Sequence, residues 1–310
     1  MTATLTEVEP AAPTRLRWFL LGPGLSTAFV VVWTSGYIAG PIGVTQMGPL
    51  VLCFWRFAVA AAALALLAVL TRAPWPRGRA AWGQIIATGL LMQTGMFGLC
   101  YLGLSLGVPV ALIALANGAS PVLVAVGGTF ALGERLSPIQ WAGTILGFAG
   151  LAVAIAGEWT GVTAGAAVLL PVAGTAAFAA GVLVQRRTGA RMDLRTGTAV
   201  QMAVAAVVTL PLALVFEGSV AFPANGASVG AVAFLGLGNS VAGFALMFLM
   251  LRYRKAADST RMILLSAPLA ALAAWPIFGQ VPDVLLWIGL AVTVVGIVIA
   301  TRPAKAVAAL

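Results

Sequence analysis

Long apolar stretches separated by short polar segments occupy the sequence from residue 19 to residue 301. Each stretch has about 18 to 24 residues. A helix of that length, rising 1.5 Å per residue, crosses a hydrocarbon core about 30 Å thick. The pattern therefore predicts an all-α integral membrane protein with ten transmembrane helices, at residues 19–41, 49–71, 82–103, 109–131, 140–157, 163–184, 196–216, 228–251, 259–279 and 284–301.

The second half of the sequence repeats the first. Residues 133–150 read "GERLSPIQWAGTILGFAG" and residues 279–296 read "GQVPDVLLWIGLAVTVVG". Three glycines and a tryptophan recur at the same displacement of 146 residues, namely Gly133, Trp141, Gly143 and Gly150 as Gly279, Trp287, Gly289 and Gly296. Because five helices is an odd number, the second copy must cross the membrane in the opposite sense. We expect a 5+5 inverted repeat, the plan of many secondary transporters.

The repeat and the charges divide the chain into four parts. Residues 19–157 form the first repeat and residues 158–302 the second, with tails at 1–18 and 303–310. Fifteen of the 17 basic residues fall in the tails or in segments on the same side as the tails. The positive-inside rule then predicts a multi-pass protein of the cell (inner or plasma) membrane with both termini cytoplasmic. The net charge of +9 is therefore a topology signal, and we expect no nucleic-acid partner.

Small residues and prolines recur at matching places in the two halves. The fifth helix carries Gly143, Gly147 and Gly150, and the tenth carries Gly289, Thr293 and Gly296. Small residues let helices approach closely in lipid, so these two stripes indicate either packing within one chain or a homodimer through helices 5 and 10. Pro121 and Pro268 interrupt the fourth and ninth helices, as fixed kinks or as hinges of a cavity that opens to either side.

A few polar and aromatic side chains lie at membrane depth. Gln93, Asn117 and Asn239 fall in the middle of the third, fourth and eighth helices. Trp33 and Tyr37 lie four residues apart on one face of the first helix, too deep for an interfacial aromatic belt. Each amide alone could make an interhelical hydrogen bond worth about 0.6 kcal/mol. Together these residues predict a cavity that binds a solute.

The stretch "LCFWRFAVA" at residues 52–60 places a positive charge inside the second helix. Arg56 lies about 10 Å below the outer end of that helix, and no acidic residue is expected in a helix interior. It either fixes the helix, by snorkelling or by binding backbone carbonyls, or binds an anionic group of the solute, which a guanidinium grips with two parallel hydrogen bonds. Arg261, beside Asp258, is expected to make a salt bridge at an inner helix end, with a solute contact as the alternative.

The composition argues against an enzyme, a cofactor site or a metal site. The chain has no histidine, and its eight acidic residues fall in tails, loops or helix ends. Metal-dependent and acid–base chemistry needs clusters of His, Cys, Asp or Glu. The glycine-rich GKS/T loop of a primary pump is missing from the sequence.

The sequence resembles the EamA family of the drug/metabolite transporter superfamily. The resemblance rests on "WTSGYIAG" leading to "RF" in the second helix, on "LGERLSPIQWAG" opening the fifth, and on the prolines of the fourth and ninth. It implies a central cavity formed by helices 1 to 4 and 6 to 9, with helices 5 and 10 outside it, and export of amino acids or related metabolites. Relatives often have glutamates where this chain has Ala267 and Gln280.

These observations favour a secondary transporter that exports small metabolites by alternating access, with amino acids or related compounds as the first candidates. The expected partners are a small-molecule solute and membrane lipid, and Trp33, Tyr37, Arg56, Gln93, Asn117 and Asn239 are the expected solute contacts. The alternatives are a carrier of a nucleoside, sugar conjugate, lipid intermediate or drug, and a channel or a membrane scaffold without transport. Because no titratable carboxylate or histidine is expected at membrane depth, we expect export down the solute gradient.

Overall fold

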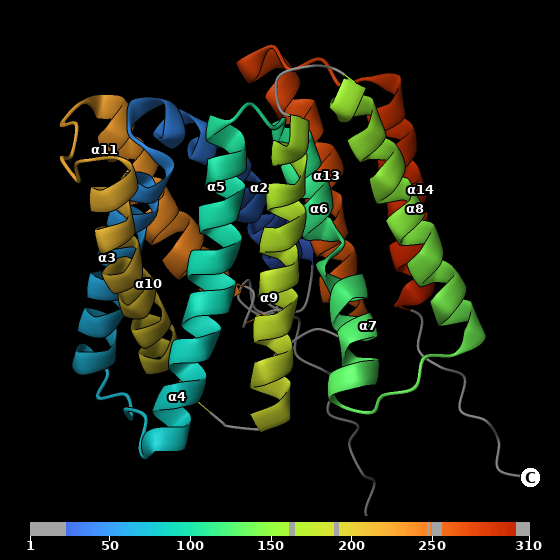
Figure 1. Ribbon diagram of the computed structural model, residues 1–310. Coiled ribbons are helices and arrows are strands. Elements are labelled where there is room, and N and C mark those ends of the chain that lie inside the picture. Colours follow the sequence, from blue (N-terminus) through green and yellow to red (C-terminus); the bar gives the residue numbers. More distant parts are fainter. Residues whose placement is uncertain (1–22, 161–164, 189–191, 247–248, 250–255, 302–310) are drawn as a thin grey trace, which may run out of the picture.

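The structure is a computed structural model that describes residues 23–160, 165–188, 192–246, 249 and 256–301. Within these residues every regular element is a helix (Figure 1). The predicted tails, and the side chains of Asp258 and Arg261, lie outside the described part. The elements are α2 (Pro23–Gln46), α3 (Pro49–Leu70), α4 (Arg79–Thr88), η1 (Gly89–Gly95), α5 (Met96–Ser105), α6 (Val110–Gly118), α7 (Ser120–Ala131), α8 (Pro138–Thr160), η2 (Gly165–Val168), α9 (Leu169–Thr188), α10 (Leu194–Phe216), α11 (Gly226–Ala233), η3 (Phe234–Gly243), α13 (Ala256–Phe278) and α14 (Val284–Ala300).

The helices confirm the all-α class and follow the predicted spans closely. Eight helical stretches of the described chain are long and apolar enough to cross a membrane. One of them, Arg79–Ser105, joins α4, η1 and α5, and another, Val110–Ala131, joins α6 and α7. Two further apolar helices are shorter: Ser266–Phe278, which is the part of α13 with described side chains, and Val284–Ala300. A count of ten spans stays a prediction.

The prolines of the fourth and ninth predicted helices behave differently from one another. Pro121 stands in the first turn of α7, where its missing N–H costs nothing, and α6 ends just before it with Ala119 at ψ −4°. By contrast, α13 continues through Pro268 without a break. The loss of one backbone hydrogen bond at Pro268 does not end this helix, so a kink or a hinge there stays a prediction.

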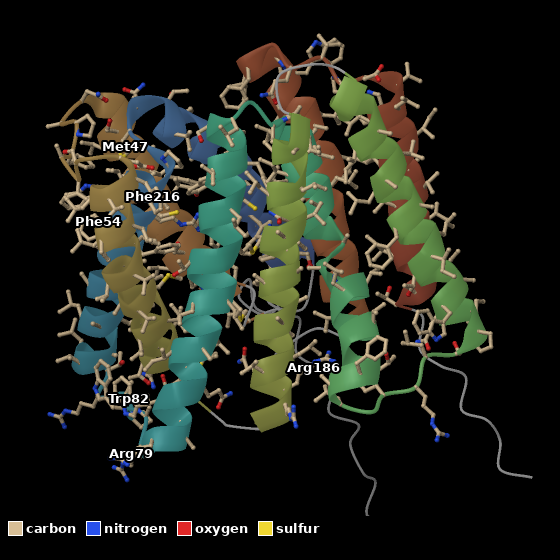
Figure 2. All side chains as sticks on the ribbon, in the orientation of Figure 1. Met47, Phe54, Arg79, Trp82, Arg186 and Phe216 are labelled. Carbon is tan, nitrogen blue, oxygen red and sulfur yellow. The ribbon has the colours of Figure 1, made fainter. Side chains whose placement is uncertain are left out.

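The bundle has two flanks and two distinct ends. Figure 1 shows α8 and α14 side by side on one flank, and α3 packed with α10 on the other, with α2, α5, α6, α9 and α13 between them. Figure 2 shows Arg79, Trp82 and Arg186 at one end of the bundle, which we call the basic end. Met47, between α2 and α3, lies at the opposite end (Figure 2). The two ends thus differ as the charge pattern predicts.

The glycine stripes of α8 and α14 pack against each other within the chain. A Cβ added to Gly289 would lie 2.6 Å from the carbonyl oxygen of Gly150, and one added to Gly296 would lie 2.8 Å from that of Gly143. Thr293 Oγ1 donates a hydrogen bond to the Gly147 carbonyl, 3.4 Å away. Only glycine allows backbones to approach so closely, so the stripes form an intramolecular seam.

The seam is antiparallel, and its contacts respect the repeat. Gly143 faces Ala300 across the seam, while Gly289 faces Ala154. Gly143 is equivalent to Gly289 in the repeat, and Ala154 is equivalent to Ala300, since 146 residues separate each pair. The two contacts are therefore equivalent, with the roles of the two halves exchanged. The glycine faces are occupied by one another, so a homodimer through helices 5 and 10, which stays a prediction, would have to use their other faces.

At the end opposite the basic end, a carboxylate ties the second half of the chain to the first. Glu217, the residue after α10, accepts hydrogen bonds from the backbone N–H groups of Leu50 and Val51, at 2.8 and 3.0 Å. These donors belong to the first turn of α3 and have no partner within the helix. Gly48 leaves the space that the carboxylate fills. The contact fixes the helix that carries Arg56.

We predict that Gly296→Ala destabilises the protein by about 2 kcal/mol or more, because the new methyl group would meet backbone atoms of Gly143 and Gly147 that cannot move aside. The matched control is Gly83→Ala in α4, where a Cβ meets nothing within 4 Å. Thermal unfolding of the purified variants measures both effects. Equal melting temperatures for the two variants would contradict the seam.

Candidate functional site

Arg56 is almost fully buried, with 1% of its surface exposed, and two helical elements supply its acceptors. Its Nε donates to Ser240 Oγ at 3.0 Å, and its Nη2 donates to Asn239 Oδ1 at 2.9 Å, both in η3. Its Nη1 donates to the hydroxyl of Tyr101 in α5. Arg56 therefore joins α3 to α5 and to η3, which supports the interpretation that it fixes its helix.

The charge of Arg56 has only neutral partners among the described side chains. Its Cζ lies 3.9 Å from the centroid of the Phe97 ring, a cation–π contact. The ion pairs in the described part of the chain involve other arginines, Arg186 and Arg195. A guanidinium has five N–H donors, and three hydrogen bonds leave two of them available. Arg56 can still grip an anion.

The acidic side chains in the described part lie at helix ends or in loops, away from Arg56. They are Glu134, Asp193, Glu217 and Asp283. Asp193 caps α10, and hydrogen bonds from Arg195 hold the pKa of its carboxyl below the ordinary value. It therefore stays a carboxylate at neutral pH, bound to its own neighbour.

A second polar cluster surrounds Asn117 in α6. Its Nδ2 donates to the Tyr37 hydroxyl of α2 at 3.2 Å, and its Oδ1 accepts from Thr175 Oγ1 of α9 at 2.9 Å. The Cys100 thiol of α5 makes a longer contact of 3.7 Å to the same oxygen. The amide thus joins α2, α5, α6 and α9 through neutral groups.

A cavity lies between the two clusters. The cavity has a volume of about 40 Å³, which is enough to hold water. Its polar lining comes from Arg56, Tyr101 and Asn239 on one side and from Tyr37 and Asn117 on the other. The apolar lining consists of Trp33, Gly36, Pro41, Met96, Phe97, Cys100, Leu104, Val110 and Ile113. A larger solute must enter a wider form of this cavity.

Five of the six predicted solute contacts line this cavity, and one does not. The five are Trp33, Tyr37, Arg56, Asn117 and Asn239. Gln93, in η1, is fully buried, and neither atom of its amide has a hydrogen-bond partner among the described residues. Its depth along the helix is as predicted, but it lies outside the cavity lining.

Gln93 and Asn239 are equivalent residues of the repeat. They are separated by the same 146 residues as the matching glycines, and both lie in π-helical segments, η1 and η3. Asn239 makes two contacts, because it accepts from Arg56 and donates to the Val32 carbonyl at 3.2 Å. The glycine at position 36 makes this approach possible, since a Cβ there would lie 2.7 Å from Asn239 Nδ2.

Three residues that contact Arg56, namely Phe97, Tyr101 and Ser240, escaped the sequence analysis. Tyr101 follows Phe97 by four residues, so the two lie one helical turn apart, and Ser240 directly follows Asn239. The aromatic pair has the same spacing as Trp33 and Tyr37, which was a usable signal. No sequence pattern marked Ser240.

Three residues noted in the sequence lie outside the cavity lining. Gln280, where relatives of the family often have glutamate, accepts a hydrogen bond from the backbone N–H of Val110 at 3.1 Å and so caps α6. The prolines Pro121 and Pro268 are not among the residues that line the cavity. Their action as hinges stays a prediction.

With this geometry in view, the comparisons with known proteins define the class of the protein. The model of the EamA-like transporter family matches residues 20–156 and 165–302. The chain therefore belongs to the EamA-like transporter family, and the family occurs in it twice. This finding confirms the resemblance and the two-part repeat.

Three relatives illustrate the range of the similarity. A probable terminal-alkyne amino-acid exporter of Streptantibioticus cattleyicolor is 30% identical over 88% of this chain and 91% of its own length. The uncharacterized transporter YvbV of Bacillus subtilis is 28% identical over 58% of this chain and 59% of its own length. The riboflavin transporter of Rhizobium johnstonii is 34% identical over 56% of this chain. The last two matches span little more than half of those proteins, the riboflavin transporter being covered over 55% of its length.

The fold also matches a protein of known crystal structure. That chain is 22% identical, and the superposition covers 89% of this chain and 95% of the other with a TM-score of 0.64. At this identity the likeness concerns the fold alone.

We predict that Gly36→Ala and Asn239→Ala each destabilise the protein, by about 1.5 to 3 kcal/mol for the loss of a hydrogen bond to a charged group. The double variant should cost no more than Asn239→Ala alone, because both changes act on the same amide. Gly243→Ala is the control, since its Cβ would make an ordinary 3.6 Å contact to Val32. Melting temperatures of the four proteins give the comparison, and strictly additive losses would contradict it.

Proposed function

We propose that this protein is a secondary transporter that exports small metabolites carrying a carboxylate, amino acids and related compounds first. The observation that carries the proposal is Arg56, a buried cation at the wall of a cavity, with neutral partners among the described side chains and two N–H donors to spare. A charge at bilayer depth is costly and typically serves a function. Here that function is to bind the anionic group of the solute.

The neutral partners of Arg56 suit this role. The acceptors of Tyr101, Asn239 and Ser240 hold the guanidinium in one orientation without neutralising its charge. A carboxylate on a nearby side chain would compete with the carboxylate of the solute. A fixed planar guanidinium binds a carboxylate with two parallel hydrogen bonds, and less entropy is lost because it is already ordered.

The protein would consist of two inverted halves of five helices each, with ten spans in all. In the transport cycle the two halves would exchange conformations. The antiparallel seam between α8 and α14 supports this, because each of its contacts recurs with the halves exchanged. Such exchange is the basis of alternating access around a site near the midplane. We place the protein in the cell membrane with the basic end and both termini in the cytoplasm, in keeping with the positions of Arg79 and Arg186.

The relatives support a transport function and leave the solute to experiment. The name of the Streptantibioticus protein, an amino-acid exporter, agrees with the carboxylate proposed here. The name of the riboflavin transporter favours a second candidate. This is a larger aromatic solute, which would stack on Trp33 and Phe97. Nucleosides, sugar conjugates, lipid intermediates and drugs belong in the same test.

We predict that amino acids raise the melting temperature of the purified wild type, whereas Arg56→Ala and Arg56→Lys bind them at least about tenfold more weakly. Lysine keeps the charge but loses the planar fork. A lost charged hydrogen bond of about 1.5 kcal/mol corresponds to this factor.

The controls for this experiment are Arg186→Ala and Arg186→Lys, because Arg186 is an exposed arginine at the basic end. They should bind like the wild type. Stabilisation by riboflavin or a nucleoside, with no response to any amino acid, would assign another solute. Unchanged affinity in both Arg56 variants would remove the anion site.

We further predict that a pH gradient does not drive uphill transport. The chain has no histidine, and the described side chains that line the cavity include no carboxylate to carry a proton through the cycle. Flux of labelled amino acids into proteoliposomes, with the membrane potential clamped, should follow the solute gradient alone. Accumulation driven by the pH gradient would contradict this and direct attention to carboxylates at helix ends, Glu134 and Asp258 first.

A further inference from the structure

Gln93 is the most unusual polar residue outside the cavity lining. It has no exposed surface, and its Oε1 and Nε2 both lack a hydrogen-bond partner among the described residues. A buried amide that is left unpaired is costly, and lipid offers nothing to pair with it. Both hydrogen-bonding atoms of this amide are therefore unused in this form of the protein, and a solute would satisfy them.

The amide lies one helical turn from residues that line the cavity, on the side of the basic end. Met96 and Phe97, which line the cavity, follow Gln93 by three and four residues, so one helical turn separates them. The chain runs from the basic end through α4 and η1 into α5 (Figure 1). Gln93 is thus the amide of this helix nearest to the cavity for a solute that leaves toward the basic end.

The repeat shows what an amide at this position does when it has partners. Its equivalent, Asn239, accepts a hydrogen bond from Arg56 and donates one to a backbone carbonyl. The sequence equivalent of Arg56 is Gln201, since "RFAVAA" at 56–61 matches "QMAVAA" at 201–206. Gln201 donates to Thr88 instead, at 2.9 Å. The counterpart of the Arg56–Asn239 contact is therefore not made, and both polar atoms of Gln93 stay available.

We infer that Gln93 is a second solute contact, reached from the basic end when the carrier opens to that side, and that it binds the head group of a zwitterionic amino acid. The amide oxygen Oε1 accepts from the ammonium group, and Nε2 donates to the carboxylate. Arg56 can bind only the carboxylate, so the two contacts together select a zwitterion. The inference rests on the proposed function. It adds the class of solute, a zwitterion, and the place that the solute reaches after it leaves the cavity.

The first test uses the full-length protein in proteoliposomes and compares Gln93→Met with the wild type. Methionine has a similar volume and no amide. The melting temperature should rise, because an unpaired polar group is removed, while exchange of labelled alanine, leucine and phenylalanine should slow at least fivefold. A stabilised variant that exchanges these amino acids at the rate of the wild type would show that Gln93 has no contact with the solute and would overturn the inference. A lower melting temperature would overturn it too, since it would mean that Gln93 has a structural partner.

The second test does not depend on the identity of the solute. Both native cysteines are buried thiols that form no disulfide, so they are first replaced by alanine. Gln93→Cys in that background should react with 2-(trimethylammonium)ethyl methanethiosulfonate added on the side of the basic end. Thr144→Cys is the matched control, because Thr144 is a buried residue of α8, 2% exposed, whose hydroxyl is also unpaired and does not line the cavity.

The two tests separate the inference from the proposed function. Labelling of Gln93→Cys at least tenfold faster than that of Thr144→Cys supports an aqueous path to position 93, and equal rates overturn it. Labelling without exchange of any amino acid by the wild type would overturn the amino-acid function and leave the path in place. Exchange by the wild type without labelling would overturn the inference and leave the function in place.

Discussion

The burial of one unneutralised charge governs the centre of this protein. Arg56 cannot turn to solvent, and the described part of the chain offers it no carboxylate, so its hydrogen bonds must come from neutral groups on other helices. Tyr101, Asn239 and Ser240 meet that need from α5 and η3, and Phe97 covers a face of the guanidinium. The contacts that make the charge tolerable in lipid also join the two halves of the chain and form one wall of the cavity.

The sequence was informative about depth and less so about direction. The lengths of the apolar stretches predicted the helices. The positions of Arg56 and Asn239 within their stretches predicted how deep they lie in the membrane, because depth follows from the rise per residue. Which way a side chain points depends on how the helices turn toward each other. Gln93 shows the limit, since a buried amide can face the cavity or a neighbouring helix at the same depth. Pro268 shows another, because the helix ends before Pro121 but continues through Pro268, and the two prolines look alike in the sequence.

The two halves share a backbone plan but have diverged in chemistry. The seam repeats its contacts, and π-helical segments occupy equivalent positions in both halves, because helix packing restricts the backbone on both sides alike. Side chains at the centre are less restricted. Arg56 has Gln201 as its counterpart, and Asn239 has Gln93, so charge is present on one side only. An asymmetric solute, with one anionic end, suits an asymmetric site within a nearly symmetric frame.

The seam also has a consequence for how the protein is made. A ribosome releases α8 before α9 to α13, and α14 follows all of them. During that interval the glycine face of α8 has no partner, and lipid chains must cover the backbone that Gly289 and Gly296 later contact. The pair of α8 and α14 therefore closes only after α9 to α13 have been made, so α14 completes a contact surface that α8 presents much earlier.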